Sequence, residues 1–119
     1  MENLEEIKKH IENNPVAFAT TTNDNNPNVI GVAFVKVVSD NKILITDNYM
    51  NQTIKDILNN PNVCLVVWDK DFVGYKLIGK AQYFTSGEWL ASVKKMKENE
   101  GLPAKGAVLI EISKIISSK

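Results

Sequence analysis

The sequence predicts a mainly β protein with flanking helices, arranged as a small closed or partly closed antiparallel barrel. About six stretches rich in β-branched and apolar residues are separated by short turns, which favours antiparallel pairing of neighbouring strands. About three amphipathic segments lie between them, and 119 residues suffice for one hydrophobic core. Many short strands around one core are typical of a small barrel, so we expect residues 1–119 to form a single domain.

The predicted helices begin after Asn3, Asn51 and Ser86, whose side chains can cap a helix N-terminus. Each helix carries apolar residues three or four positions apart, and the Asn-Pro pairs at 14–15 and 60–61 end the first two.

The predicted strands share a high content of β-branched and apolar residues: 16–22, 28–38, 43–46, 63–68, 72–84 and 107–116. The stretch 28–38 is apolar on both faces for most of its length. We therefore expect it to be buried on both sides, as at a barrel wall covered by a helix or a partner subunit.

Charge and composition exclude several classes of function. The chain has 14 basic and 14 acidic residues, so it lacks the positive excess that general nucleic-acid binding requires. All the basic residues are lysines. A bound phosphate must therefore be held by backbone N–H groups, hydroxyls, amides or lysines, without a guanidinium fork.

Cysteine usage and hydropathy indicate a cytoplasmic protein with no membrane partner. Cys64, the single cysteine, lies in an apolar run and is expected to be buried and inert, since no second cysteine can pair with it. No apolar stretch reaches the length of a membrane span.

No catalytic or metal-binding signature is recognisable. His10, the single histidine, follows two lysines on the first predicted helix and is expected to be solvated. We therefore predict no catalytic residue and no metal site, and any chemistry would come from a bound cofactor.

One segment could receive an anionic cofactor. A strand ends at Thr46, a polar loop follows, and a helix starts at Gln52 and Thr53. Free N–H groups at a helix N-terminus bind anions, and these two side chains add neutral donors. A helix simply capped by Asn51 explains the same pattern. Five aromatic residues are candidates for stacking on a planar ligand, although core or interface packing explains each of them better: Tyr49, Trp68, Phe72, Tyr75 and Trp89.

The order of these segments resembles the FMN-binding split-barrel superfamily, which includes pyridoxamine 5′-phosphate oxidase and small bacterial FMN-binding proteins. The residues that carry the resemblance extend over nearly the whole chain: 16–21 after the first helix, Pro27 before 28–38, the hairpin 40–46, Gln52 and Thr53 opening the second helix, 60–63 after it, and 79–83 before the third.

The resemblance implies an antiparallel split β-barrel of the pyridoxamine 5′-phosphate oxidase-like type, with FMN bound at the interface of a homodimer. The positions similar to the family's FMN contacts are Ile30, Gly31, Val32 and Ala33 beside the isoalloxazine ring, Thr46 and Asp47 at the ribityl chain and ring, and Gln52 and Thr53 at the phosphate. Replacing Thr53 by Ala should then weaken FMN binding by about 1 kcal/mol and leave the apo-protein nearly as stable.

Two departures from the family pattern qualify the expected function. Family members usually carry Lys or Arg where this chain has Gln52, which should weaken FMN binding by about 1–2 kcal/mol unless Lys55 compensates. The sequence also ends three residues after Ile116 without arginine, whereas true pyridoxamine phosphate oxidases add a basic C-terminal segment. We therefore expect it not to oxidise pyridoxamine phosphate.

The resemblance thus implies an FMN-dependent oxidoreductase that acts on an unknown small substrate or redox partner. Two alternatives stay open: a non-enzymatic FMN carrier or electron-transfer protein, and a barrel that binds heme or a deazaflavin.

Overall fold

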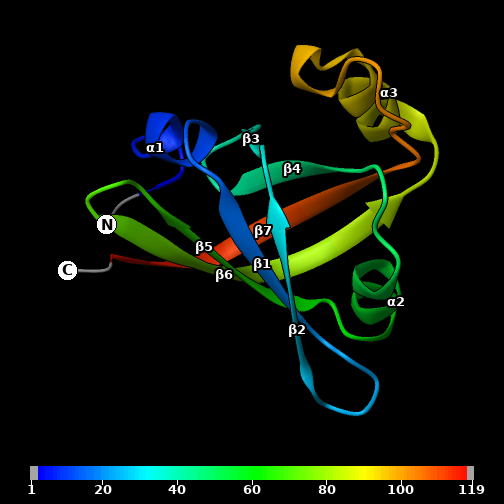
Figure 1. Cartoon of the computed structure of the whole chain (residues 1–119), viewed down its shortest axis with the longest axis horizontal. Helices are drawn as coiled ribbons and strands as arrows, with labels where there is room; N and C mark the ends of the chain where they lie inside the picture. Colours follow the sequence, from blue (N-terminus) through cyan, green and yellow to red (C-terminus); the bar gives the residue numbers. More distant parts are fainter. Residues whose placement is uncertain (1–2, 118–119) are drawn as a thin grey trace.

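The computed structural model describes residues 3–117 and contains one strongly curled antiparallel sheet of seven strands. The strand order is β2-β1-β5-β6-β7-β4-β3, so the two strands at the ends of the sheet, β2 and β3, are consecutive in the chain. The sheet curls into a half-open barrel with helices at its margins (Figure 1). The predicted fold class, a mainly β antiparallel split barrel, is confirmed.

The strands are β1 (Val16–Thr21), β2 (Pro27–Val32), β3 (Lys36–Val37), β4 (Lys42–Asp47), β5 (Asn62–Trp68), β6 (Gly74–Phe84) and β7 (Gly106–Ser117). The helices are α1 (Lys8–Glu12), α2 (Gln52–Asn59), α3 (Gly87–Lys95) and the short 3-10 turn η1 (Lys97–Asn99).

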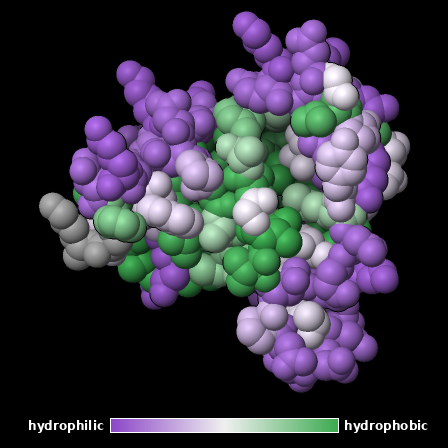
Figure 2. All heavy atoms as spheres, viewed as in Figure 1, coloured by the Kyte–Doolittle hydropathy of each residue, from purple (hydrophilic) through white to green (hydrophobic). Residues whose placement is uncertain are grey.

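The long strand predicted for 28–38 is two strands, because the chain leaves the sheet at Ala33 and re-enters it at Lys36 on the opposite end. Within one chain β2 is not buried on both sides: exposed and half-buried residues alternate along it. Figure 2 shows apolar surface gathered in the middle of the same view, bordered by hydrophilic surface. The apolar residues of β2 therefore contribute to a surface that stays exposed in the single chain.

The core lies inside the curl, where Phe18, Ile45, Leu65, Leu77 and Ile110 are fully buried. A second, smaller cluster joins α3 to β4 and β7. Helix α2 packs against β1, β2 and β6.

Cys64, predicted to be buried, is partly exposed, because its side chain lies on the less buried face of β5. Within residues 3–117 no helix has both the length and the apolar character needed to cross a bilayer.

Candidate functional site

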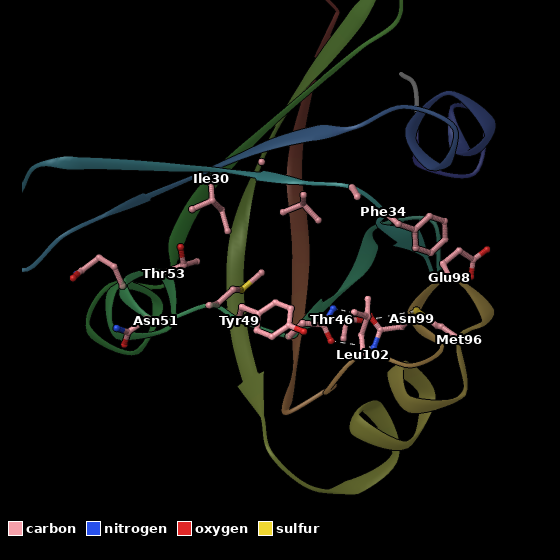
Figure 3. A pocket seen from close by; sticks show the side chains of 16 residues that line it. Ile30, Phe34, Thr46, Tyr49, Asn51, Thr53, Met96, Glu98, Asn99 and Leu102 are labelled. Carbon is pink, nitrogen blue, oxygen red and sulfur yellow. Dashed lines mark hydrogen bonds between the residues drawn. The ribbon is translucent and has the colours of Figure 1, made fainter.

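A groove of about 410 Å³ runs along the seam where the two ends of the sheet approach each other. One wall is the end of β2 with the residues that follow it, and the opposite wall is the end of β4 with its loop to α2 (Figure 3). Helix α2 forms one end of the groove, and η1 with the loop after it forms the other. This volume lies within the range of small-molecule and cofactor sites.

Seven of the eight residues predicted to contact a cofactor line this groove: Ile30, Gly31, Val32, Ala33, Thr46, Gln52 and Thr53. The fold brings them together because β2 is an end strand that faces the loop between β4 and α2 across the seam. Within residues 3–117 no strand pairs with the outer edge of β2, so its backbone groups there are available to a ligand or a second chain.

The N-terminus of α2 has no side-chain cap. Asn51 makes no capping hydrogen bond, and the first intrahelical bond runs from the Lys55 N–H to the Asn51 carbonyl at 3.3 Å. The N–H groups before Lys55 therefore have no partner within the helix. Of the two explanations that the sequence left open, capping by Asn51 is not what the structure has. The uncapped end retains the partial positive charge that attracts anions.

Thr53 and Gln52 both lie at this end of the groove, but they differ in exposure and in hydrogen bonding. Thr53 is only 2% exposed, and its hydroxyl oxygen accepts a hydrogen bond from the Asn28 amide at 3.2 Å. The exposed Gln52 donates one side-chain N–H to Asp56 at 2.7 Å, which leaves its second N–H for a ligand. Because Thr53 is buried and bonded, its removal should also cost some stability, contrary to the expectation from sequence.

Asp47, the eighth predicted residue, does not line the groove. Its carboxylate is fully buried and accepts hydrogen bonds from the Met50 N–H at 2.8 Å and the Tyr83 hydroxyl at 2.6 Å. The Lys105 ammonium lies 3.9 Å from it. Burial, then the hydrogen bond to Asp47 and its negative charge, raises the pKa of Tyr83 to about 12. Asp47 thus holds the loop 47–50 in place from the buried side, away from the groove.

The opposite end of the groove is built by a pair of amides that the sequence analysis missed. Asn48 donates to Asn99 at 2.7 Å and Asn99 donates back at 3.1 Å. The Asn48 oxygen also accepts the Ala104 N–H at 2.9 Å. Glu98, the one charged residue among those that line the groove, stands at this end, on the far side from α2 (Figure 3). An anionic ligand group would therefore lie at the α2 end.

Most of the remaining candidates lie elsewhere. Among the five aromatic candidates only Tyr49 lines the groove, with its side chain 75% exposed at the mouth. His10 is partly buried and not solvated as predicted: its Nε2 lies 2.8 Å from the Val73 carbonyl and 3.4 Å from Asp69. Within residues 3–117 no three His, Cys, Asp or Glu side chains form a candidate metal site.

The curled sheet and its seam groove define the class of protein, a split β-barrel of the pyridoxamine 5′-phosphate oxidase-like type. The family model described as pyridoxamine 5′-phosphate oxidase matches residues 4–119. The chain belongs to this family.

The chain is also similar to a curated protein and to several solved structures. The protein MJ0282 of Methanocaldococcus jannaschii is 38% identical over 97% of this chain and 80% of its own length. HupZ of Group A Streptococcus has a similar structure, with a TM-score of 0.87, 24% identity and coverage of 96% of this chain and 92% of that chain.

Two further solved structures share the fold at lower identity. An FMN-binding protein of Syntrophomonas wolfei has a TM-score of 0.80 and 16% identity, with 98% of this chain and 86% of that chain covered. An F420 reductase has a TM-score of 0.71 and 15% identity, with 90% and 92% covered. At 15% and 16% identity, these two similarities show a shared fold and nothing about ligand or activity.

Proposed function

We propose that this protein binds FMN in the seam groove as one half of a homodimer and acts as a flavin-dependent oxidoreductase. The observation that carries the proposal is the uncapped N-terminus of α2, which opens on the groove next to the free edge of β2. A helix N-terminus at one end of the groove suits a phosphate group. The exposed strand backbone along its side suits a planar ring that forms hydrogen bonds at its edge.

The residues present fit this group. At the α2 end, the backbone N–H groups of Gln52 and Thr53 and the Thr53 hydroxyl would hold the phosphate. The main chain of residues 30–33 would lie beside the ring, and Thr46 would contact the ribityl chain. Asp47, which does not line the groove, would contribute by fixing the loop. Glu98, at the other end, disfavours the reversed orientation of an anionic ligand.

A second copy of the chain would complete the site. Strand β2 has an unpaired edge, and Val29 on it is 61% exposed. An open strand edge with apolar side chains is normally covered, and a subunit seated there would also close the open side of the groove.

When bound, FMN supplies hydride or electron transfer between a reductant and a small acceptor or redox partner. The chain's own residues bind the phosphate, orient the ring and exclude water from its covered face. The cytoplasm remains the expected compartment, since Cys64 has no intrachain partner.

A deazaflavin is the second candidate ligand. The lining of the groove contains no lysine, so its phosphate end offers neutral donors only. The solved F420 reductase also shares the fold. An FMN carrier without turnover is the non-enzymatic form of the same binding function.

Titration of the purified protein with FMN, riboflavin and a deazaflavin, followed by flavin fluorescence, tests the proposal. We expect saturable FMN binding at one flavin per chain, and a mass of two chains by light scattering. A protein that binds none of the three ligands, or a strict monomer, would contradict it. Turnover of NAD(P)H or of small acceptors by the FMN-loaded dimer separates the oxidoreductase from a carrier.

A further inference from the structure

A connected set of polar side chains lies behind the α2 end of the groove, between the sheet and the helix. Asp56 of α2 and Thr20 of β1 are 1% and 3% exposed, and the Thr20 hydroxyl lies 2.7 Å from the Asp56 carboxylate. Asn28 of β2 lies between Thr20 and Thr53, with its side-chain nitrogen 3.2 Å from each hydroxyl oxygen. Gln52 donates to the second oxygen of Asp56 at 2.7 Å.

The carboxylate at one end of this set determines the direction of every hydrogen bond in it. A carboxylate only accepts, so Thr20 must give its single proton to Asp56. The Thr20 oxygen can then only accept, which requires Asn28 to present its NH₂ group and not its carbonyl oxygen. The second N–H of the same group reaches Thr53, so the Thr53 oxygen is also an acceptor.

The Thr53 hydroxyl proton is therefore left over. Among residues 3–117 we find no acceptor for it, although Thr53 is 98% buried and lines the groove. A buried hydroxyl whose oxygen is already engaged satisfies its proton only by donating into the groove.

We propose that Asp56 is a positioning residue that acts through Thr20 and Asn28 to make the Thr53 hydroxyl an obligatory donor toward the groove. This inference rests on the proposed function, and it deepens it by naming what selects the ligand's end group. An obligatory donor favours a ligand that ends in a strong acceptor, such as the phosphate of FMN, over riboflavin, which ends in a neutral hydroxyl. It would give the groove, whose lining contains no cationic side chain, a means of selecting for phosphate.

The central experiment replaces Thr20 by Val. This substitution keeps the shape of the side chain and removes the hydroxyl that bonds both Asp56 and Asn28. Without the Thr20 hydroxyl, nothing fixes the orientation of the Asn28 amide, so Thr53 is free to donate to Asn28. We expect FMN affinity to fall about fivefold and riboflavin affinity to stay unchanged. The matched control Thr20→Ser keeps the hydroxyl and should retain the wild-type preference for FMN.

A double-mutant cycle separates positioning from a merely structural role. If Thr20 acts only through the Thr53 hydroxyl, Thr20→Val should weaken FMN binding no further in a Thr53→Ala background. Additive losses, or a Thr20→Val variant that keeps the wild-type ratio of FMN to riboflavin affinity, would overturn the inference.

Nuclear magnetic resonance of the ligand-free wild type tests the orientation itself and does not depend on the variants folding. We expect both Asn28 side-chain amide protons to show cross-relaxation with the Thr20 and Thr53 side chains. An Asn28 amide turned the other way overturns the inference. The expected orientation in a protein that binds no flavin would instead overturn the proposed function and leave the hydrogen-bond direction standing.

Discussion

The two ends of the groove differ in how their polar groups are held. At the α2 end, Thr53 is supported by side chains from regular strands and a helix: the half-buried Asn28 bonds it directly, and Thr20 and Asp56 behind it are almost entirely buried. At the other end, Asn48 and Asn99 come from a loop and a single 3-10 turn, and they hold mainly each other beside the 44% exposed Leu102. A rigid polar end suits a constant anionic group, whereas an end built on irregular backbone suits the variable part of a ligand or substrate.

The largest expected effect comes from removing the amide pair. Asn48→Ala leaves the Ala104 N–H and the Asn99 amide without their partner, so we expect the free energy of unfolding to fall by about 2–3 kcal/mol. Urea denaturation measures this change. Asn23→Ala, in an exposed turn, is the control and should change stability by less than about 0.5 kcal/mol. Equal effects of the two substitutions would mean that the pair does not hold this end together.

The loop 47–50 joins the two ends of the groove, and the stability that it gains from the hydrogen bond between Tyr83 and Asp47 should fall at alkaline pH. The pKa of Tyr83 is about 12 in the folded protein, and that of tyrosine in an unfolded chain is about 10. The unfolded chain therefore releases this proton first, so the stabilisation is complete below about pH 10 and is lost as the pH rises to about 12.

Comparison of wild type with Tyr83→Phe by urea denaturation at pH 8 and 11.5 measures this contribution. We expect the wild type to lose on the order of 2 kcal/mol more than the variant between these pH values. Tyr49→Phe, which removes the hydroxyl of an exposed ring, is the matched control. An identical loss in Tyr83→Phe would show that the bond to Asp47 does not stabilise the loop.

A cation placed at the α2 end should strengthen its preference for anions. Gln52→Lys adds a charge beside the proposed phosphate position, so we expect FMN to bind about tenfold more tightly at low salt, with the gain shrinking as salt is added. Riboflavin affinity should not change. Gln82→Lys, on an exposed position of β6 outside the groove lining, is the matched control. An equal gain in both variants would indicate only a general charge effect.

The smallest expected effect is that of Thr53→Ala. Loss of the hydroxyl removes one donor to the proposed phosphate and one acceptor for Asn28, so FMN affinity and unfolding free energy should each fall by about 1 kcal/mol. Titration and urea denaturation measure the two losses separately. Thr85→Ala, exposed in the turn before α3, should alter neither. Unchanged FMN affinity in Thr53→Ala would move the phosphate away from α2.

Local patterns were enough to predict the elements and most of the groove. β-branched runs, turn residues and helical spacing identify the strands and helices, and the start of α2 at Gln52 follows from the polar loop before it. The seven predicted residues that line the groove lie in two short segments, Ile30 to Ala33 and Thr46 to Thr53, which a resemblance can align.

What could not be predicted depends on contacts between distant residues. Thr20 and Asp56 are 36 positions apart, and Asn48 and Asn99 are 51 apart, so no spacing rule connects them. Asp47 is charged and follows a strand, so in the sequence it looks like a residue that faces a ligand. Its burial and its hydrogen bond to Tyr83, which lies far away in the chain, show that it faces the interior. The break at residues 33–35 was hidden because its residues are as apolar as the strands on either side.

That break has a mechanical consequence. Strands β2 and β3 share no ladder, and only the three residues from Ala33 to Val35 cross between them. Widening of the barrel along this line would therefore break no hydrogen bond between β2 and β3. On one side of the break Val35 is fully buried in the core, whereas on the other side Ala33 is exposed. The flavin proposed above could then enter the groove without the breaking of any pair of strands.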